Sequence, residues 1–366
     1  MSENLIYGAD ILSYGAVADG KTDCSDALLK ALENGENLIS FPFGTYLFSK
    51  PITLNSNTKL HFHTNANIIF APENDSAECF ICADNASSLE ICGGLFNTKD
   101  GVKCNVFSFR GCQNIRISSC SVNAPTGIAS ILLESCEYAS VVNVTFNGMS
   151  DAVVLTGDCE RVTVKNCTVK SAVNVIQCAT QNRQCDINGL DIRNITVLYC
   201  DSFLELLCGK AENVSIENIN ARFSFAFLKL FSEFSLGEAV LENLEIYIVD
   251  RVSKDGKNPA YFSLASTPDN LEVRNFRRLT ELESTPPVPT LLLKNTNSEK
   301  AKLVIDGISL DNVISARGKS KTVAMTTAKL TNPSGKFIYT LEVTASRNDT
   351  FNIPYGDFDY LTIYGN

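Results

Sequence analysis

Glu205 and Lys229 are the two residues of this chain whose types and spacing most clearly suggest chemistry. They are 24 residues apart, and each lies between two leucines. In a strand whose side chains alternate, the leucines point inward and the charged residue between them points outward. If about 24 residues make one coil of a stacked structure, the carboxylate and the ammonium group face each other about 4.8 Å apart. Such a pair is either a cross-strand ion pair or the acid and cation of a binding groove.

Two further acids extend this outward face. Asp201 shares a coil with Glu205, whereas Asp151 falls two coils earlier, about 9.6 Å along the axis. Two carboxyl groups cleave glycosidic bonds with retention when they are about 5 to 5.5 Å apart, and with inversion at about 6.5 to 9.5 Å. We therefore take Asp151, Asp201 and Glu205 as the candidate catalytic residues.

The same face also supplies candidates for binding a substrate. Gln177 occupies the position of Glu205 one coil earlier, and Asn174 lies three residues before it. The chain contains no tryptophan, so stacking against a sugar would fall to phenylalanine or tyrosine. The predicted substrate-binding residues are Asn174, Gln177, Lys229, Phe203 and Phe227.

An internal repeat of about 25 residues supports the assumption that residues about 24 positions apart lie on neighbouring coils. In each clear copy an asparagine follows an apolar residue by two positions, at Asn143, Asn166, Asn194, Asn218, Asn243 and Asn275. The copies are rich in Val, Ile and Thr and have no helical periodicity, which is typical of short stacked strands. Asparagine tolerates the left-handed conformation that a sharp bend requires. We predict that the six asparagines form one ladder of amide hydrogen bonds at a corner.

The repeat predicts an all-β fold, a single-stranded right-handed parallel β-helix of about ten coils. Residues 59–315 form the predicted coils. Residues 1–58 form an amino-terminal cap, with a short helix begun by Thr22 or Asp23 that closes the open end of the core. Residues 316–366 change to alternating segments around turn residues, which predicts antiparallel strands that cap the carboxyl end or join subunits.

The 14 cysteines all lie at or before Cys208. Five of them occupy fixed positions of the repeat, namely Cys112, Cys120, Cys136, Cys159 and Cys167. Free cysteine packs as a small apolar residue, so we predict reduced, buried thiols and no metal. Cys79 and Cys82, with Cys92 and His61 or His63 nearby, form an alternative zinc set, although a second C-x-x-C pair is lacking.

The net charge and the amino-terminal sequence limit which partners and which cellular location we expect. A net charge of −10 argues against nucleic acid or an anionic membrane as a partner. No apolar run reaches membrane-spanning length. The start, "MSENLIYGAD", lacks the basic stretch and apolar run of a signal peptide. Together with the many thiols this predicts a cytoplasmic protein, and release on a phage particle is equally compatible.

The stretches "YGAVADGKTDCSDALLKAL" and "FPFGTYLFSKPITL" resemble the amino-terminal segment of the pectate-lyase-like superfamily. That superfamily has the parallel β-helix fold and contains hydrolases, lyases, epimerases and phage tailspikes. Within it, "NGMSDAVVLTGDCERVTVKNC" is most similar to the polygalacturonase family, with Asp151 in the place of the first catalytic aspartate. The other family motifs fall on Val173 and Asn174, on Cys200, Asp201 and Ser202, and on Lys229, Leu230 and Phe231.

The resemblance implies a carbohydrate-active protein that acts on a polysaccharide or oligosaccharide without a cofactor. The leading hypothesis is a polygalacturonase-like glycoside hydrolase. One alternative is a non-catalytic glycan-binding or tailspike-like structural β-helix, in which the family's active site has been lost. Another is a polysaccharide lyase with Lys229 as its base. A dimer or trimer through the carboxyl-terminal segment is the predicted assembly.

Overall fold

The computed structural model confirms an all-β right-handed parallel β-helix, with about nine turns. It describes residues 8–73, 77–124, 128–148, 150–180, 183–248, 260–266 and 268–280, and beyond these the strands named below. The chain divides into two compact units, Met1–Val154 with Val162–Ala172, and Leu155–Arg161 with Val173–Asn366. The boundaries expected from the sequence at residues 58 and 315 stay a prediction.

The amino-terminal cap contains the one α-helix of the described residues, α1 (Ser25–Glu33). It follows β1 (Ala9–Asp10), a short 3-10 helix η1 (Ile11–Tyr14) and β2 (Asp19–Asp23). The apolar side of the helix is buried, and it consists of Ala27, Leu28, Ala31 and Leu32. Asp23 fixes the start of the helix, because its Oδ1 accepts hydrogen bonds from the backbone N–H and the hydroxyl of Ser25 at 2.9 and 2.6 Å. Its carboxylate therefore has a structural task.

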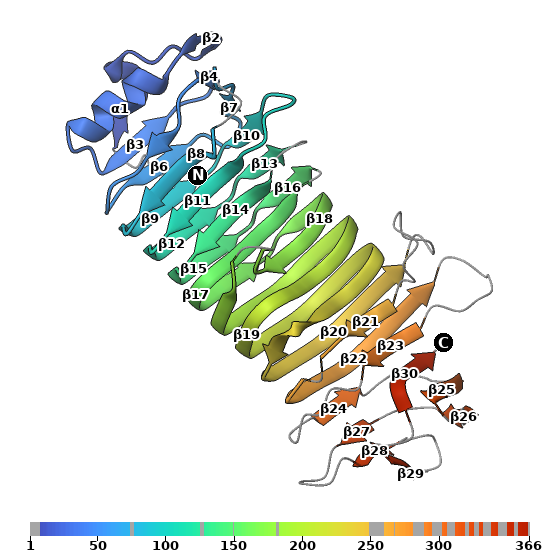
Figure 1. Cartoon of the computed structure of the whole chain (residues 1–366). Helices are drawn as coiled ribbons and strands as arrows, with labels where there is room; N and C mark the ends of the chain where they lie inside the picture. The colour runs from blue at the N-terminus through green and yellow to red at the C-terminus, as the bar shows by residue number, and fades with distance from the viewer. Residues whose placement is uncertain are drawn as a thin grey trace, which may run out of the picture. The chain divides into compact units, whose positions relative to one another are not determined.

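The first unit stacks its strands in three parallel columns (Figure 1). The first column is β3 (Leu38–Phe41), β6 (Lys59–Phe62), β9 (Ser87–Cys92), β12 (Gln113–Ser118) and β15 (Glu137–Val142). The second is β4 (Thr45–Phe48), β7 (Asn67–Phe70), β10 (Leu95–Thr98), β13 (Ser121–Ala124) and β16 (Thr145–Gly148). The third is β5 (Ile52–Thr53), β8 (Cys79–Asp84), β11 (Asn105–Arg110) and β14 (Ala129–Glu134).

The register of these strands builds the core. Consecutive coils pair one inward aliphatic residue with the next along a single line, which runs through Ile39, Leu60, Ile91, Ile117 and Val141. All five are buried. Burying each such side chain contributes about 1.5 to 3 kcal/mol, so the stacked lines hold the coils in register.

The second unit contains the longest strands. Following β17 (Asp151–Lys165) and β18 (Thr168–Cys178), both shared between the units, it contains β19 (Cys185–Leu236), β20 (Glu238–Ile248), β21 (Ala260–Leu264), β22 (Asn270–Thr280), β23 (Pro289–Lys294) and β24 (Lys302–Ile305). The pairs β19–β20, β20–β22, β19–β21, β21–β23 and β22–β24 are parallel. Because successive coils repeat the same corners, side chains one coil apart lie above one another.

The carboxyl-terminal segment is antiparallel, as predicted. It consists of β25 (Asn312–Gly318), β26 (Thr322–Met325), β27 (Lys329–Thr331), β28 (Ile338–Glu342), β29 (Thr350–Pro354) and β30 (Phe358–Tyr364). Its pairs β25–β26, β25–β30, β27–β28 and β28–β29 all run antiparallel.

The repeated asparagines have the predicted corner conformation. All six have positive φ angles between 48° and 56°. In the second unit the side-chain amides of Asn275, Asn243, Asn218 and Asn194 form a chain of hydrogen bonds of 2.6, 3.1 and 3.1 Å. We call these four residues the asparagine ladder. The first unit holds a second amide chain that was not predicted, through Asn147, Asn123, Asn97 and Asn67.

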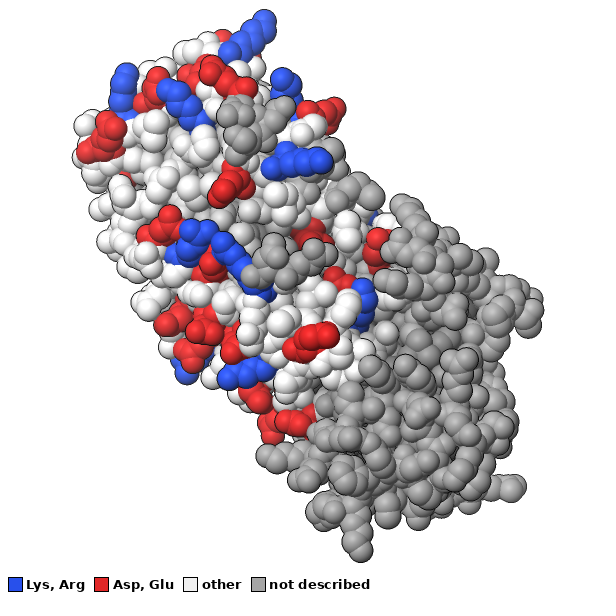
Figure 2. Space-filling model, in the orientation of Figure 1, with Lys and Arg blue, Asp and Glu red and all other residues white. Residues whose placement is uncertain are grey.

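The five cysteines at repeat positions are free and buried, as predicted, and the other nine thiols are free as well. Among the described residues no three His, Cys, Asp or Glu side chains converge as a metal site requires. On the face shown in Figure 2, lysine and arginine side chains lie among aspartates and glutamates. No helix in the described ranges is long and apolar enough to cross a membrane.

Candidate functional site

Glu205 lies in β19 with 9% of its surface exposed, and both of its carboxylate oxygens accept hydrogen bonds. The Nζ of Lys229 donates to Oε1, and the Nδ2 of Asn174 donates to Oε2 at 3.1 Å. The prediction that Glu205 and Lys229 are neighbours one coil apart is therefore confirmed. Because the Lys229 and Glu205 side chains are only 19% and 11% exposed, the pair is better shielded from water than a surface ion pair.

The local sequence explains why this acid and this cation face outward. The leucines on either side of Glu205 and of Lys229 are at most 1% exposed, so they anchor both strand segments to the core. Lys229 pairs in register with Ser263 of β21, which continues the polar line into the next coil. Parallel strand pairing thus holds the charged groups on a rigid platform.

Two aromatic residues that the sequence analysis did not select flank Lys229. Its Nζ lies 4.9 Å from the ring centroid of Phe225 and 4.5 Å from that of Phe231, within the range of cation–π attraction. Both rings are half-buried. The alternation that places Lys229 outward also places Phe231 outward, so this residue was predictable. We call Asn174, Glu205, Lys229, Phe225 and Phe231 the Glu205 cluster.

Asp201 lies four residues before Glu205 in the same strand and has its own partners. Its Oδ1 accepts hydrogen bonds from the hydroxyl of Ser224 at 2.8 Å and from the hydroxyl of Tyr199 at 3.4 Å. No hydrogen bond from a described residue reaches its Oδ2. Glu205 is therefore bonded at both carboxylate oxygens, whereas Asp201 has one oxygen that no described residue bonds.

The structure does not place Phe203 and Phe227 where a sugar could stack on them. Both are 0% exposed, and their rings stack on each other with centroids 4.7 Å apart and planes at 15°. The expectation that they bind substrate is wrong, because consecutive buried residues at the bends of β19 turn these rings into the core. Phe225 and Phe231 take their place as the aromatic residues of this face.

Two other predicted residues, Gln177 and Asp151, are not among the described hydrogen-bond partners of Glu205. Gln177 is half-buried in β18, but the hydrogen bond to Glu205 comes from Asn174, three residues earlier. Asp151 is the first residue of β17 and belongs to the first unit. Its role with Glu205 stays a prediction.

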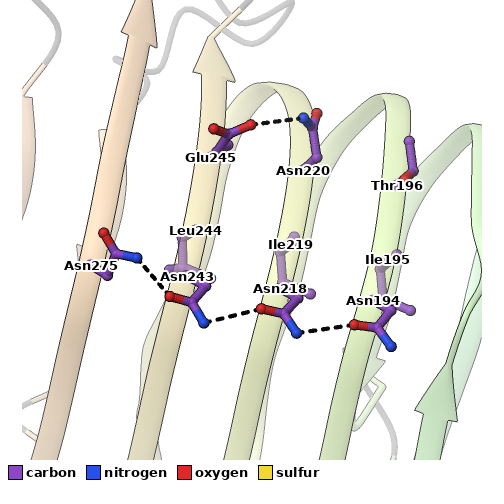
Figure 3. Close-up of a pocket in the computed structure, with 10 residues that line it drawn as sticks. All are labelled: Asn194, Ile195, Thr196, Asn218, Ile219, Asn220, Asn243, Leu244, Glu245 and Asn275. Atoms are coloured by element: carbon purple, nitrogen blue, oxygen red, sulfur yellow. Dashed lines mark hydrogen bonds between the residues drawn. The ribbon is translucent and has the colours of Figure 1, made fainter.

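A polar groove of the second unit is lined by the asparagine ladder. It has a volume of about 550 Å³. Figure 3 shows the ladder amides along one edge and Thr196, Asn220 and Glu245 along the other. Among the described residues that line the groove, Glu245 is the one ionisable residue, and it accepts a hydrogen bond from Asn220 at 3.3 Å. The groove could hold hydroxyl groups, but its described lining offers no second titratable group for acid–base chemistry.

A second groove of about 720 Å³ carries four acids and one lysine, Asp158, Glu160, Asp186, Glu212 and Lys210. The described residues that line it include no aromatic side chain. The Glu205 cluster, unlike the described lining of these two grooves, brings together an acid, a cation and aromatic rings.

A family model described as rhamnogalacturonase A/epimerase, pectate lyase-like matches residues 9–201, which is more than half of the chain. The chain belongs to this family. The match confirms the resemblance to the pectate-lyase-like superfamily. Within the rhamnogalacturonase A/epimerase match lie Asp151, Asn174 and Asp201, whereas Glu205 and Lys229 follow its end. No curated protein sequence matches the chain.

Solved structures share the fold at low sequence identity. The surface adhesin PfbA of Streptococcus pneumoniae is 14% identical, with a TM-score of 0.54 over 76% of this chain and 82% of its own. The iota-carrageenase of A. fortis is 13% identical, with a TM-score of 0.50 over 77% of this chain and 92% of its own. An exopolygalacturonase of Thermotoga maritima is 15% identical, with a TM-score of 0.48 over 75% and 92%. The likeness to the first two shows a shared β-helix.

Proposed function

We propose that the chain is a carbohydrate-active protein that binds an oligosaccharide or polysaccharide across the Glu205 cluster and hydrolyses its glycosidic bonds. The observation that carries this proposal is the meeting of Glu205, Lys229 and two half-buried phenylalanines on one rigid face. Membership of a family described by a rhamnogalacturonase and an epimerase supports sugars as the substrate class.

The hydrogen bonds suggest a division of roles between the two carboxyl groups. Glu205 accepts at both oxygens, so it acts as the carboxylate that orients water or stabilises positive charge on the sugar. Asp201 keeps Oδ2 clear of described partners, so it is the better candidate to carry a proton to the leaving oxygen. Phe225 and Phe231 offer apolar surface to the sugar rings.

A second candidate function, glycan binding without catalysis, is favoured by one specific observation. Both Glu205 oxygens are already bonded, to Lys229 and Asn174, which is the arrangement of a structural ion pair. In that case the residues of the Glu205 cluster would bind a glycan without cleaving its glycosidic bonds.

The deciding experiment is a screen for reducing-sugar release on neutral and uronate polysaccharides, combined with binding measurements. The wild-type chain is compared with Glu205→Gln and Asp201→Asn. Asp191→Asn is the matched control, because Asp191 is an acid of the same strand that pairs with an exposed arginine, Arg193. Hydrolysis predicts that each of the first two variants loses about 100- to 10,000-fold in turnover while the control keeps its rate.

Binding without catalysis predicts a different pattern. Wild type would release no sugar from any polymer but would bind one, and Phe231→Ala would weaken that binding. If Asn220→Ala weakens binding and Phe231→Ala does not, the ligand occupies the groove of Figure 3 and the site is misplaced.

A further inference from the structure

The ammonium group of Lys229 already has partners within the protein. Its Nζ donates a hydrogen bond to Oε1 of Glu205 and lies 4.9 and 4.5 Å from the ring centroids of Phe225 and Phe231. Its side chain is 19% exposed. A carboxylate and two aromatic rings are the groups that attract an ammonium ion most strongly in a protein. The Glu205 cluster therefore offers little of its positive charge to a ligand.

The acids of this strand outnumber that cation. Lys229 balances the charge of Glu205, but Asp201, four residues earlier in β19, has no such counter-charge among its described hydrogen-bond partners. Those partners are the hydroxyls of Ser224 and Tyr199, which are uncharged. Two carboxylates and one ammonium group leave this segment of β19 with a net negative charge.

The donors and acceptors of the site favour a ligand that donates hydrogen bonds. A carboxylate only accepts them, and Oδ2 of Asp201 is bonded by no described residue. The hydroxyl groups of a neutral sugar supply donors. The carboxylate of a uronate supplies only acceptors, and it carries a charge that Glu205 and Asp201 repel. The rings of Phe225 and Phe231 offer apolar surface to the C–H face of either sugar.

We propose that the Glu205–Lys229 ion pair is a specificity-determining pair, through which the Glu205 cluster selects neutral sugars and excludes uronates. This inference rests on the proposed function, namely that a glycan binds across the cluster. Glu205 acts in two ways, because it holds the Lys229 ammonium group away from the ligand and its own charge repels a second carboxylate. Specificity is often achieved by such a repulsive element against the wrong ligand. Without the charge of Glu205, the same lysine becomes a cation that binds a uronate.

The test measures binding by titration calorimetry with matched pairs of oligosaccharides. Each pair consists of a uronate oligosaccharide and the same oligosaccharide with its carboxyl groups reduced to alcohols, prepared from polygalacturonate, from alginate and from C6-oxidised cellulose. Linkage and length are equal within a pair, so the carboxylate is the only difference. Wild type should bind the reduced member of a pair at least about 10-fold more tightly than the uronate member.

Three variants isolate the role of the ion pair. Glu205→Gln keeps the shape of the side chain and frees Lys229, so the affinity for the uronate should rise at least about 10-fold. The double variant Glu205→Gln with Lys229→Met lacks the freed cation and should show no such gain. Asp191→Asn is the matched control, because Asp191 is an acid of the same strand that pairs with Arg193, and it should leave both affinities unchanged.

A measurement on the wild-type chain keeps the test valid if a variant fails to fold. Uronate binding should strengthen as the ionic strength rises, because salt screens the repulsion, whereas binding of the reduced ligand should change little. Equal or tighter binding of the uronate, or an unchanged uronate affinity in Glu205→Gln, would overturn this inference and leave glycan binding at the cluster intact. If no member of any pair bound and no polymer released sugar, the proposed function itself would be contradicted.

Discussion

The second unit carries two outward polar lines that follow the coils, and they differ in one respect. The asparagine ladder repeats one neutral residue type in four coils, with φ angles between 48° and 56° and one kind of hydrogen bond. The Glu205 cluster changes residue in each coil, from Asn174 to Glu205 to Lys229, and carries opposite charges in partly buried positions.

The difference separates scaffold from site. A bend that recurs in every coil requires the same backbone conformation each time. This local requirement explains why the same residue type, asparagine, occurs at every position of the ladder. No backbone requirement explains a glutamate, a lysine and an amide in successive coils of one line. A residue that departs from the repeat, at a position where the repeat predicts an outward side chain, therefore indicates function.

The largest stability effect should come from breaking the charge pair. Lys229→Met leaves the Glu205 carboxylate shielded and without its cation, which should lower the free energy of unfolding by about 3 kcal/mol. Adding Glu205→Leu should restore most of that loss, because no uncompensated charge then remains. Denaturant unfolding of the two single variants and the double variant measures the coupling. Additive effects would show that the pair is not a unit.

A smaller effect is expected at the ladder, where the cause is the backbone. Asn218→Ala removes two amide hydrogen bonds and places a β-carbon at positive φ, which should cost about 2 kcal/mol. Asn218→Gly loses the same bonds but tolerates the conformation, so it should cost about half as much. Glycan binding should be unchanged in both. If alanine and glycine cost the same, the left-handed corner does not explain the asparagine.

The smallest effect concerns an acid outside both lines. Burial tends to raise the pKa of Asp23, but hydrogen bonds from Ser25 and Ser49 outweigh it, and the pKa is lowered. A carboxyl whose folded-state pKa lies below its unfolded value of about 3.9 stabilises the protein above that pH, and the contribution is lost as pH falls through the folded pKa. Asp23→Asn should therefore flatten the acid side of the stability curve. If the free energy of unfolding of Asp23→Asn depended on pH in the same way as that of wild type from pH 7 to pH 3, this assignment would be contradicted.

Much of the fold was predictable because the coil repeats. The asparagines at 194, 218, 243 and 275 are single residues, yet each specifies a corner and together they set the register of the unit. The second amide chain through Asn67 and Asn147 was missed, because its strands are only four residues long and leave too few positions to show a repeat.

The site was predictable only where strand alternation holds. Glu205 and Lys229 lie between buried leucines and were placed correctly. Phe203 and Phe227 lie next to bends, where two inward residues follow each other, and alternation assigned them to the wrong side. Counting by the repeat placed Gln177 opposite Glu205, whereas the structure brings Asn174, 31 residues before Glu205, to hydrogen-bonding distance.

The most direct test of the central claim is a crystal structure of the chain with the oligosaccharide that the screen selects. The account predicts sugar rings over Phe225 and Phe231, with hydroxyl groups bonded to Glu205 or Lys229. Sugar bound along Asn194, Asn218 and Asn243, with the Glu205 cluster empty, would contradict it.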